Sequence, residues 1–188
     1  MPKVKIQTST AVFLLLLAVF GRDTVAFMPI LAAAAHEIGH LAVMLLLRVP
    51  VREMEITLFG AEIKSGLFGV GSAGRAVIYF AGAGMNILTG VAAVLLFKQS
   101  FLANVFFVSS LGLGVLNLVP IRSLDGGKIL EVICESVCPT RADRILNITS
   151  IVSLAFLWLT AVYLMLCLGG NISLLLFCMF MFVSLYLR

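Results

Sequence analysis

Charge is scarce in this sequence. Only 12% of the 188 residues are charged, whereas 62% are hydrophobic, and the mean hydropathy is +1.16. This composition excludes a soluble globular protein and is typical of a polytopic membrane protein. The basic residues lie scattered without interleaved aromatic residues, so the net charge of +4 gives no indication of nucleic-acid binding.

Cysteine pairs at metal-binding or redox spacing are also lacking. The four cysteines, Cys134, Cys138, Cys167 and Cys178, include no C-x-x-C motif, and we interpret them as reduced, small apolar residues. Cys134 and Cys138 are four residues apart, but without a further cysteine or histidine nearby a metal site there is disfavoured.

Histidine is the rarest of the chemically active residues, and both copies fall in one apolar run, residues 31–47. His36 and His40 are separated by four residues, which places them on one face of a helix with Glu37 beside them. This is the H-E-x-x-H pattern of zinc-dependent hydrolases, with two zinc ligands and a general base. The alternative is a helix that merely carries buried polar residues.

A catalytic zinc site needs a third protein ligand, and no third histidine exists. Asp125 lies in a polar break between apolar runs, followed by Gly126 and Gly127. Irregular backbone at membrane depth is tolerated only where it is buried in protein or lines a water-filled cavity. Asp125 is therefore the expected third ligand, with an ordinary Asp-Gly turn as the alternative.

The apolar runs predict an all-α polytopic membrane protein with about six transmembrane helices. A short amphipathic helix is expected over about 128–137, after a break at 117–127 that should not be regular helix. Residues 51–64 are rich in strand formers and predict a short β-hairpin at the membrane interface, with a plain loop as the alternative. The expected spans are residues 11–20, 24–47, 75–97, 100–118, 145–168 and 172–187.

Six spans would place both termini on one side of the membrane. If that side is the cytosol, it holds all 13 basic residues except Arg22 and Lys98, as the positive-inside rule requires. Both termini are then cytosolic, and His36 and His40 lie in the half of their span nearer the cytosol. We expect a multi-pass protein of the cell membrane.

The two motifs together resemble those of the site-2 protease family, the intramembrane zinc metalloproteases of peptidase family M50. The resemblance rests on His36-Glu37-Ile38-Gly39-His40 and on Asn117-x-x-Pro120-x-x-x-Leu124-Asp125-Gly126-Gly127, in the family's order and separation. It covers about residues 10–144, and the compact layout is most similar to the bacterial sporulation-type members. A bacterial inner membrane or sporulation membrane is the location this implies.

Two departures from the family pattern affect positions that shape the backbone. In the Gly-Pro-x-x-Asn element the proline is replaced by Ala83, between Gly82 and Asn86, and Ser123 stands where a proline often precedes Leu-Asp-Gly-Gly. The resemblance assigns Asn86 and Asn117 to steadying the substrate backbone or the oxyanion, with bonding to neighbouring helix backbone as the alternative. It retains His36, His40 and Asp125 as ligands of one zinc ion and Glu37 as base.

The expected organisation is one transmembrane metalloprotease domain, residues 1–188, with a core of 10–144, a C-terminal helix pair at 145–187, and no PDZ or CBS domain. The expected function is cleavage of a transmembrane or membrane-associated protein near the cytosolic face. A sigma-factor-type regulatory precursor is the substrate that the resemblance suggests, and a regulatory membrane inhibitor is a candidate partner. The alternatives are a metal-binding transporter, which needs ligands along a path with alternating access, and a non-catalytic helix-binding scaffold.

An unwound substrate peptide has exposed amides that can pair with a strand edge. We expect the strand region at 51–64 to offer that edge, so that the substrate binds by strand addition.

Overall fold

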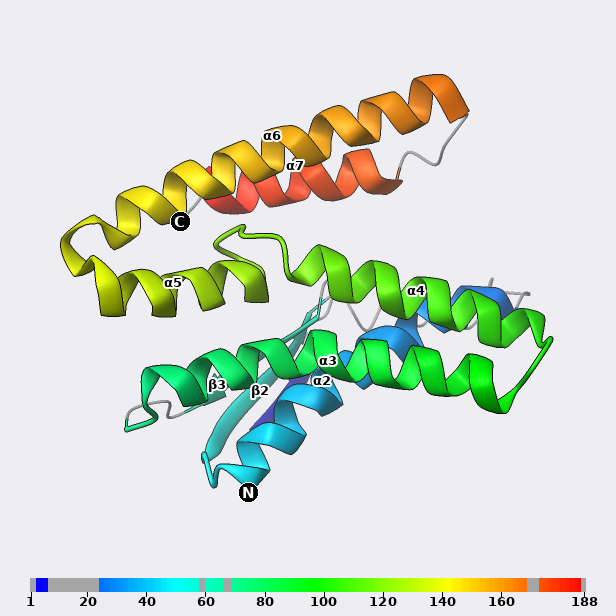
Figure 1. The fold of residues 1–188 in the computed structure, drawn as a ribbon, viewed down its shortest axis with the longest axis horizontal. Coiled ribbons are helices and arrows are strands. Elements are labelled where there is room, and N and C mark those ends of the chain that lie inside the picture. Colours follow the sequence, from blue (N-terminus) through cyan, green and yellow to red (C-terminus); the bar gives the residue numbers. More distant parts are fainter. Residues whose placement is uncertain (1–2, 7–23, 58–59, 66–68, 169–172, 187–188) are drawn as a thin grey trace. The chain divides into compact units, whose positions relative to one another are not determined.

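The structure is a computed structural model that describes residues 3–6, 24–57, 60–65, 69–168 and 173–186 (Figure 1). The first predicted span, residues 11–20, lies outside the described residues. The chain divides into two compact units, Met1–Leu116 and Asn117–Arg188. The organisation that we expected, one domain with a core of 10–144 and a C-terminal helix pair at 145–187, stays a prediction.

In its described residues, the first unit contains a small sheet and the helices α2, α3 and α4. Its elements are β1 (Lys3–Ile6), the 3-10 helix η1 (Thr24–Phe27), α2 (Met28–Leu46), β2 (Val51–Thr57), β3 (Gly60–Ser65), α3 (Ser72–Leu96) and α4 (Phe101–Asn117). The second unit contains α5 (Asp125–Val137), the 3-10 helix η2 (Pro139–Arg141), α6 (Ala142–Leu168) and α7 (Ser173–Tyr186).

Three of the described helices are long and apolar enough to cross a membrane. They are Thr24–Leu46, Ser72–Leu96 and Pro139–Cys167, and each coincides with a predicted span. Helices α4 and α7 are apolar but shorter, with 17 and 14 residues. At 1.5 Å per residue they reach about 25 and 21 Å, against a hydrocarbon core of about 30 Å. The fold is thus that of a helical membrane protein, and a count of six spans stays a prediction.

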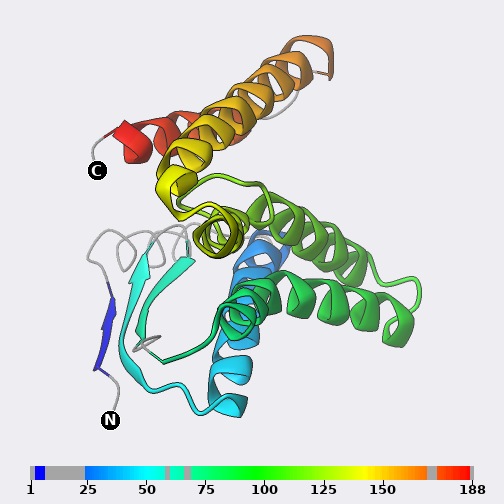
Figure 2. The same cartoon turned by 60° about the vertical axis from the view of Figure 1, so that its left-hand side comes forward.

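Two antiparallel strands occupy the region where we predicted a hairpin. β2 pairs with β3 from Val51 opposite Ser65 to Thr57 opposite Gly60. β1 pairs in parallel with the other side of β2, so the order is β1-β2-β3, as Figure 2 shows. Of the two predicted strands, β2 is therefore central, and β3 alone has an edge that no described strand covers.

Small residues let the helices of the first unit approach closely. A Cβ on Gly39 of α2 would lie 2.5 Å from the main-chain oxygen of Ala81 on α3, and one on Gly90 of α3 would lie 3.2 Å from Phe107 on α4. Close backbone approach through small residues is how membrane helices gain packing energy when lipid is as apolar as the side chains. Outside these contacts, Ile38 and Leu45 of α2 are exposed.

In the second unit, the loop at 118–124 is fixed to the helix pair α6–α7. Ile121 and Leu124 are buried in a cluster with Leu154, Ala161, Cys178 and Met181. The backbone N–H of Arg122 donates to Ser150 Oγ at 3.0 Å, and its guanidinium donates to Asn147 and Asp143. The loop therefore has a defined conformation where it delivers the chain to α5.

The start of α5 corrects a sequence prediction. We expected Gly126 and Gly127 in an irregular break, but α5 begins at Asp125 and includes both. The backbone N–H of Lys128 donates to Leu124 O at 3.1 Å, which closes the first turn. Glycine is needed here because a Cβ on Gly126 would overlap Leu118 O and one on Gly127 would overlap Ile121 O. The glycines allow the helix to start against the loop that precedes it.

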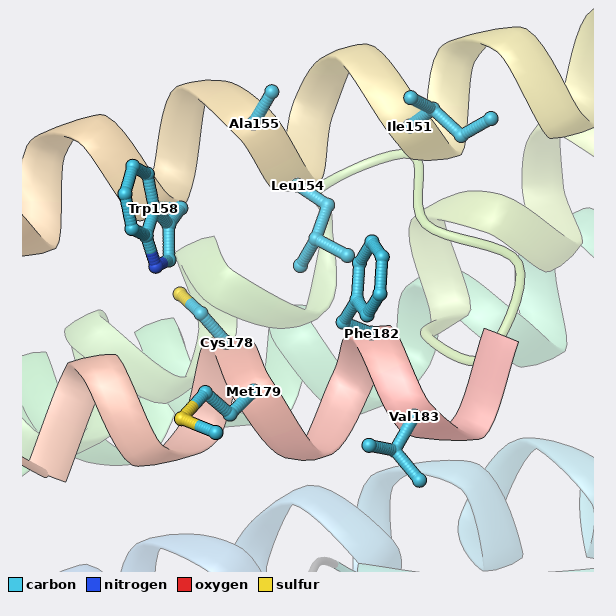
Figure 3. Close-up of a pocket in the computed structure, with 8 residues that line it drawn as sticks. All are labelled: Ile151, Leu154, Ala155, Trp158, Cys178, Met179, Phe182 and Val183. Carbon is cyan, nitrogen blue, oxygen red and sulfur yellow. The ribbon is translucent and has the colours of Figure 1, made fainter. Parts of the chain in front are cut away.

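An apolar pocket of about 410 Å³ lies between α6 and α7 (Figure 3). Trp158 and Leu154 of α6 face Cys178 and Phe182 of α7 across it. None of its lining residues is acidic or basic, so it offers packing space for an apolar group without catalytic chemistry. The residues that line it are Ile151, Leu154, Ala155, Trp158, Cys178, Met179, Phe182 and Val183.

Candidate metal centre

Helix α2 brings its two histidines together on its buried face. His36 and His40 are 3% and 6% exposed, and their Nε2 atoms lie 3.1 Å apart. Two nitrogens bound to one tetrahedral Zn²⁺ at 2.0–2.1 Å would be about 3.3 Å apart. The spacing of the pair therefore fits two ligands of one zinc ion with only a small adjustment.

Helix α3 holds both rings from the opposite side. Nδ1 of His40 donates to Ile78 O at 2.7 Å, since a carbonyl oxygen can only accept. Nδ1 of His36 lies 3.2 Å from Nδ2 of Asn86, which is fully buried. Both Nδ1 atoms thus have partners on α3, which leaves the two Nε2 atoms facing each other. Zinc-binding histidines are oriented by such a bond on the other nitrogen.

Gly82 lies midway between these two partners, four residues from each. A Cβ at this position would lie 2.5 Å from His40 Nε2 and 2.6 Å from His36 Nε2. Any side chain here would occupy the space in front of the two ligand atoms. The missing Cβ therefore leaves room for an ion, and Ile78, Gly82 and Asn86 form one stripe of α3 at a spacing of four residues.

Glu37 follows His36 on α2 and is half-buried. Its Oε2 atom is shielded from solvent. A carboxylate next to the ligand pair is placed to accept a proton from a water molecule at the metal, as general bases in zinc hydrolases do. The role of Glu37 as general base stays a prediction.

Asp125 belongs to the second unit, where it is the first residue of α5 and is 6% exposed. Lys128 Nζ lies 3.3 Å from its Oδ1. A buried carboxylate is tolerated when it is paired, as it is here with Lys128, so burial alone does not assign a ligand role. Its assignment as the third ligand stays a prediction that rests on the motif.

The remaining predicted positions have defined places in the fold. Asn117 is the last residue of α4 and is half-buried. Ala83 is fully buried inside α3, which continues through it as regular helix. A proline there would remove an N–H from that helix. Ser123, at the other departure, donates from Oγ to the sulfur of Met181 at 3.2 Å.

Two contributors to the site were missed by sequence reasoning. Ile78 acts through its main-chain oxygen, which leaves no residue-type signature. Gly82 was noticed only as part of an incomplete motif, although its four-residue spacing from Asn86 was visible. Side-chain chemistry alone finds ligands and bases, and it does not find the backbone that orients them.

The donor set defines the chemistry available. A bound zinc ion would supply a Lewis acid that acidifies water and polarises a peptide carbonyl. Glu37 is the predicted base, which would hold the proton taken from water and deliver it to the leaving amine. The bond to Ile78 O keeps His40 in the tautomer that carries its proton on Nδ1, so that Nε2 bears the lone pair.

Comparison with known proteins supports this chemistry. Residues 97–160 match the model of peptidase family M50, and that range includes Asp125. A search of the curated proteins finds no significant match. Among solved structures, the fold is similar to that of a site-2 protease from Methanocaldococcus jannaschii, with a TM-score of 0.65 and 19% identity. That alignment covers 97% of this chain and 88% of the other. The match to peptidase family M50 is confined to residues 97–160, and the similarity to the site-2 protease is one of fold.

Proposed function

We propose that the protein is an endopeptidase that cuts a transmembrane or membrane-associated protein near the cytosolic face of the membrane. The observation that carries the proposal is the pair of buried Nε2 atoms, 3.1 Å apart and beside Glu37, on a helix long enough to span a membrane. A metal centre buried among apolar helices is suited to a substrate segment that itself lies in the membrane.

Three residues would hold the zinc ion. His36 and His40 provide two nitrogens from α2, and Asp125 provides a carboxylate oxygen from the start of α5. This set has the three protein ligands of a catalytic zinc and leaves the fourth position to water or substrate. Asp125 is supported as the third member because no further histidine exists and because it stands in the second motif.

Asn117 is proposed to steady the substrate backbone or the oxyanion. It ends α4 directly before the loop that leads to Asp125, and its side chain is only half-buried. A carboxamide with remaining exposure is able to donate to a peptide oxygen.

The substrate segment must be extended before it can be cut, because a helix hides its amides. We propose that the unwound segment pairs with the outer edge of β3, and that β2 does not serve as this edge because it has strands on both sides. Strand addition would supply main-chain hydrogen bonds that do not depend on the substrate's sequence.

The orientation with both termini in the cytosol follows from the charge distribution, and it puts the cut near the cytosolic leaflet. Release of a cytosolic regulatory factor is the outcome that such a cut allows. A sigma-factor-type precursor is the substrate we propose, and a membrane-bound inhibitor is the regulator we propose.

The test compares membrane and cytosolic fractions from cells that carry wild-type protein or Glu37→Gln. Glutamine keeps the size of the side chain and cannot accept the proton, so the variant should bind zinc and lose cleavage. We expect a full-length membrane protein to accumulate with Glu37→Gln and its cytosolic fragment to disappear. Identical fractions would contradict the proposal, and a substrate with a periplasmic fragment would contradict the orientation.

A further inference from the structure

The surroundings of Asn86 differ from those expected of a residue that contacts the substrate. Its side chain has no exposure, although α3 is otherwise well exposed along its length. Nδ2 donates to His36 Nδ1 at 3.2 Å, and Oδ1 has no hydrogen-bond partner among the described residues. A buried amide oxygen without a partner is costly, which calls for an explanation.

The hydrogens of this cluster can be followed from one residue to the next. Asn86 Nδ2 donates to His36 Nδ1, so the proton of His36 is on Nε2. His36 Nε2 then donates to His40 Nε2 at 3.1 Å, and His40 Nδ1 donates to Ile78 O at 2.7 Å. Every ring nitrogen of the two histidines takes part in this chain of bonds.

Zinc binding requires a different tautomer of His36 and the same tautomer of His40. Both Nε2 atoms must be free of hydrogen to bind the metal, so His36 must carry its proton on Nδ1. Nδ1–H then needs an acceptor in the place where Nδ2 of Asn86 lies. Rotation of the Asn86 amide by half a turn exchanges Nδ2 for Oδ1, which is the atom without a partner.

We infer that Asn86 is a positioning residue for the metal centre, whose Oδ1 accepts from His36 Nδ1–H and holds Nε2 toward the zinc ion. It acts through His36 and does not touch the substrate, in contrast to the oxyanion role that the family resemblance suggests. The inference rests on the proposed function, because it assumes that His36 and His40 are zinc ligands.

The experiment measures zinc affinity by chelator competition on the purified full-length protein in detergent. Asn86→Leu removes the acceptor and keeps the size, whereas Asn86→Asp keeps an acceptor at the same reach. Thr89→Val is the matched control, because it removes a polar group from α3 whose hydroxyl bonds only to Met85 O and Asn86 O in its own helix.

Loss of such a partner typically weakens metal binding by about 10–100-fold, and this is the increase in dissociation constant expected for Asn86→Leu. Asn86→Asp and Thr89→Val should bind zinc as the wild type does. Equal affinity of Asn86→Leu and wild type would overturn the inference and leave the proposed function standing. A wild-type protein that binds no zinc through His36 and His40 would overturn the proposed function itself.

A second measurement does not depend on a variant that folds. In zinc-loaded wild-type protein with ¹⁵N-labelled histidine, the nitrogen spectrum should show Nδ1 protonated on both histidines. Coordination of zinc through Nδ1 of His36 would overturn the inference. An oxyanion role would instead reduce turnover in Asn86→Leu at unchanged zinc affinity.

Discussion

Nδ1 of His40 donates to the main-chain oxygen of Ile78 at 2.7 Å, across the packed pair of helices α2 and α3. This bond fixes the tautomer of His40, a predicted zinc ligand. Because the acceptor is a main-chain oxygen, no side-chain substitution at position 78 removes it. The geometry of the histidine pair therefore depends on two helices, α2, which carries the two histidines, and α3, which orients their rings. Changes in α3 should affect zinc binding although α3 supplies no ligand.

Gly82→Ala tests this directly. The new Cβ would lie 2.5–2.6 Å from the Nε2 atoms of both histidines, closer than side chains approach in folded proteins. We expect zinc binding and cleavage to be lost, measured as bound zinc per chain. Gly84→Ala is the matched control, since its Cβ would meet only Phe80, at 3.9 Å. If Gly82→Ala binds zinc as tightly as Gly84→Ala, the orienting role of α3 is wrong.

The paired glycines at the start of α5 should resist substitution. A Cβ on Gly126 or Gly127 would overlap a carbonyl oxygen of the preceding loop, so Gly126→Ala and Gly127→Ala should shift the loop or the first turn. Such overpacking costs typically about 1–3 kcal/mol of stability. The measurement is thermal unfolding in detergent, with Gly112→Ala on α4 as control because nothing lies near its Cβ. Equal melting temperatures for all three variants would disprove the close fit.

The stability of the loop before α5 should depend more on the burial of its apolar side chains than on its ion pair. Ile121 is fully buried, and Ile121→Ala should cost about 2–5 kcal/mol through the cavity it leaves. The ion pair between Arg122 and Asp143 is short, 2.7 Å, but the Asp143 side chain is 83% exposed. Asp143→Asn should therefore cost about 1 kcal/mol or less. Denaturant titration measures the free energy of unfolding of both variants. A larger loss of stability in Asp143→Asn than in Ile121→Ala would contradict our interpretation.

Proline substitutions in the sheet test strand addition. Alternate amides of an edge strand point toward its partner and away from it, so single prolines at positions 61–64 of β3 should fall into two classes. One class breaks the pairing with β2 and destabilises the sheet, and the other removes only outward donors and should slow substrate cleavage in a folded protein. In central β2 every proline should destabilise the sheet. Normal cleavage by all folded β3 variants would exclude binding at this edge.

The sequence was informative where side-chain chemistry decides the outcome. The spacing of His36 and His40 predicts their shared helix face, and hydropathy predicts the three long helices. The sequence was less informative where main-chain contacts determine the structure. Helix α5 begins at Asp125 because the glycines fit against Leu118 and Ile121, and a pattern of two glycines after an aspartate reads more readily as a turn. Strand β1 pairs with β2 across long sequence separation, which local patterns do not reveal.

Our central proposal, from the motif and from the lack of a third histidine, is that Asp125 is the third zinc ligand beside His36 and His40. The most direct measurement is the zinc affinity of Asp125→Ala, with Glu135→Ala as control because Glu135 is an exposed carboxylate on the same helix. We expect wild type and Glu135→Ala to bind one zinc ion per chain, and Asp125→Ala to bind it at least about 100-fold more weakly, as loss of one of three protein ligands implies. Zinc binding by Asp125→Ala with wild-type affinity would contradict the account.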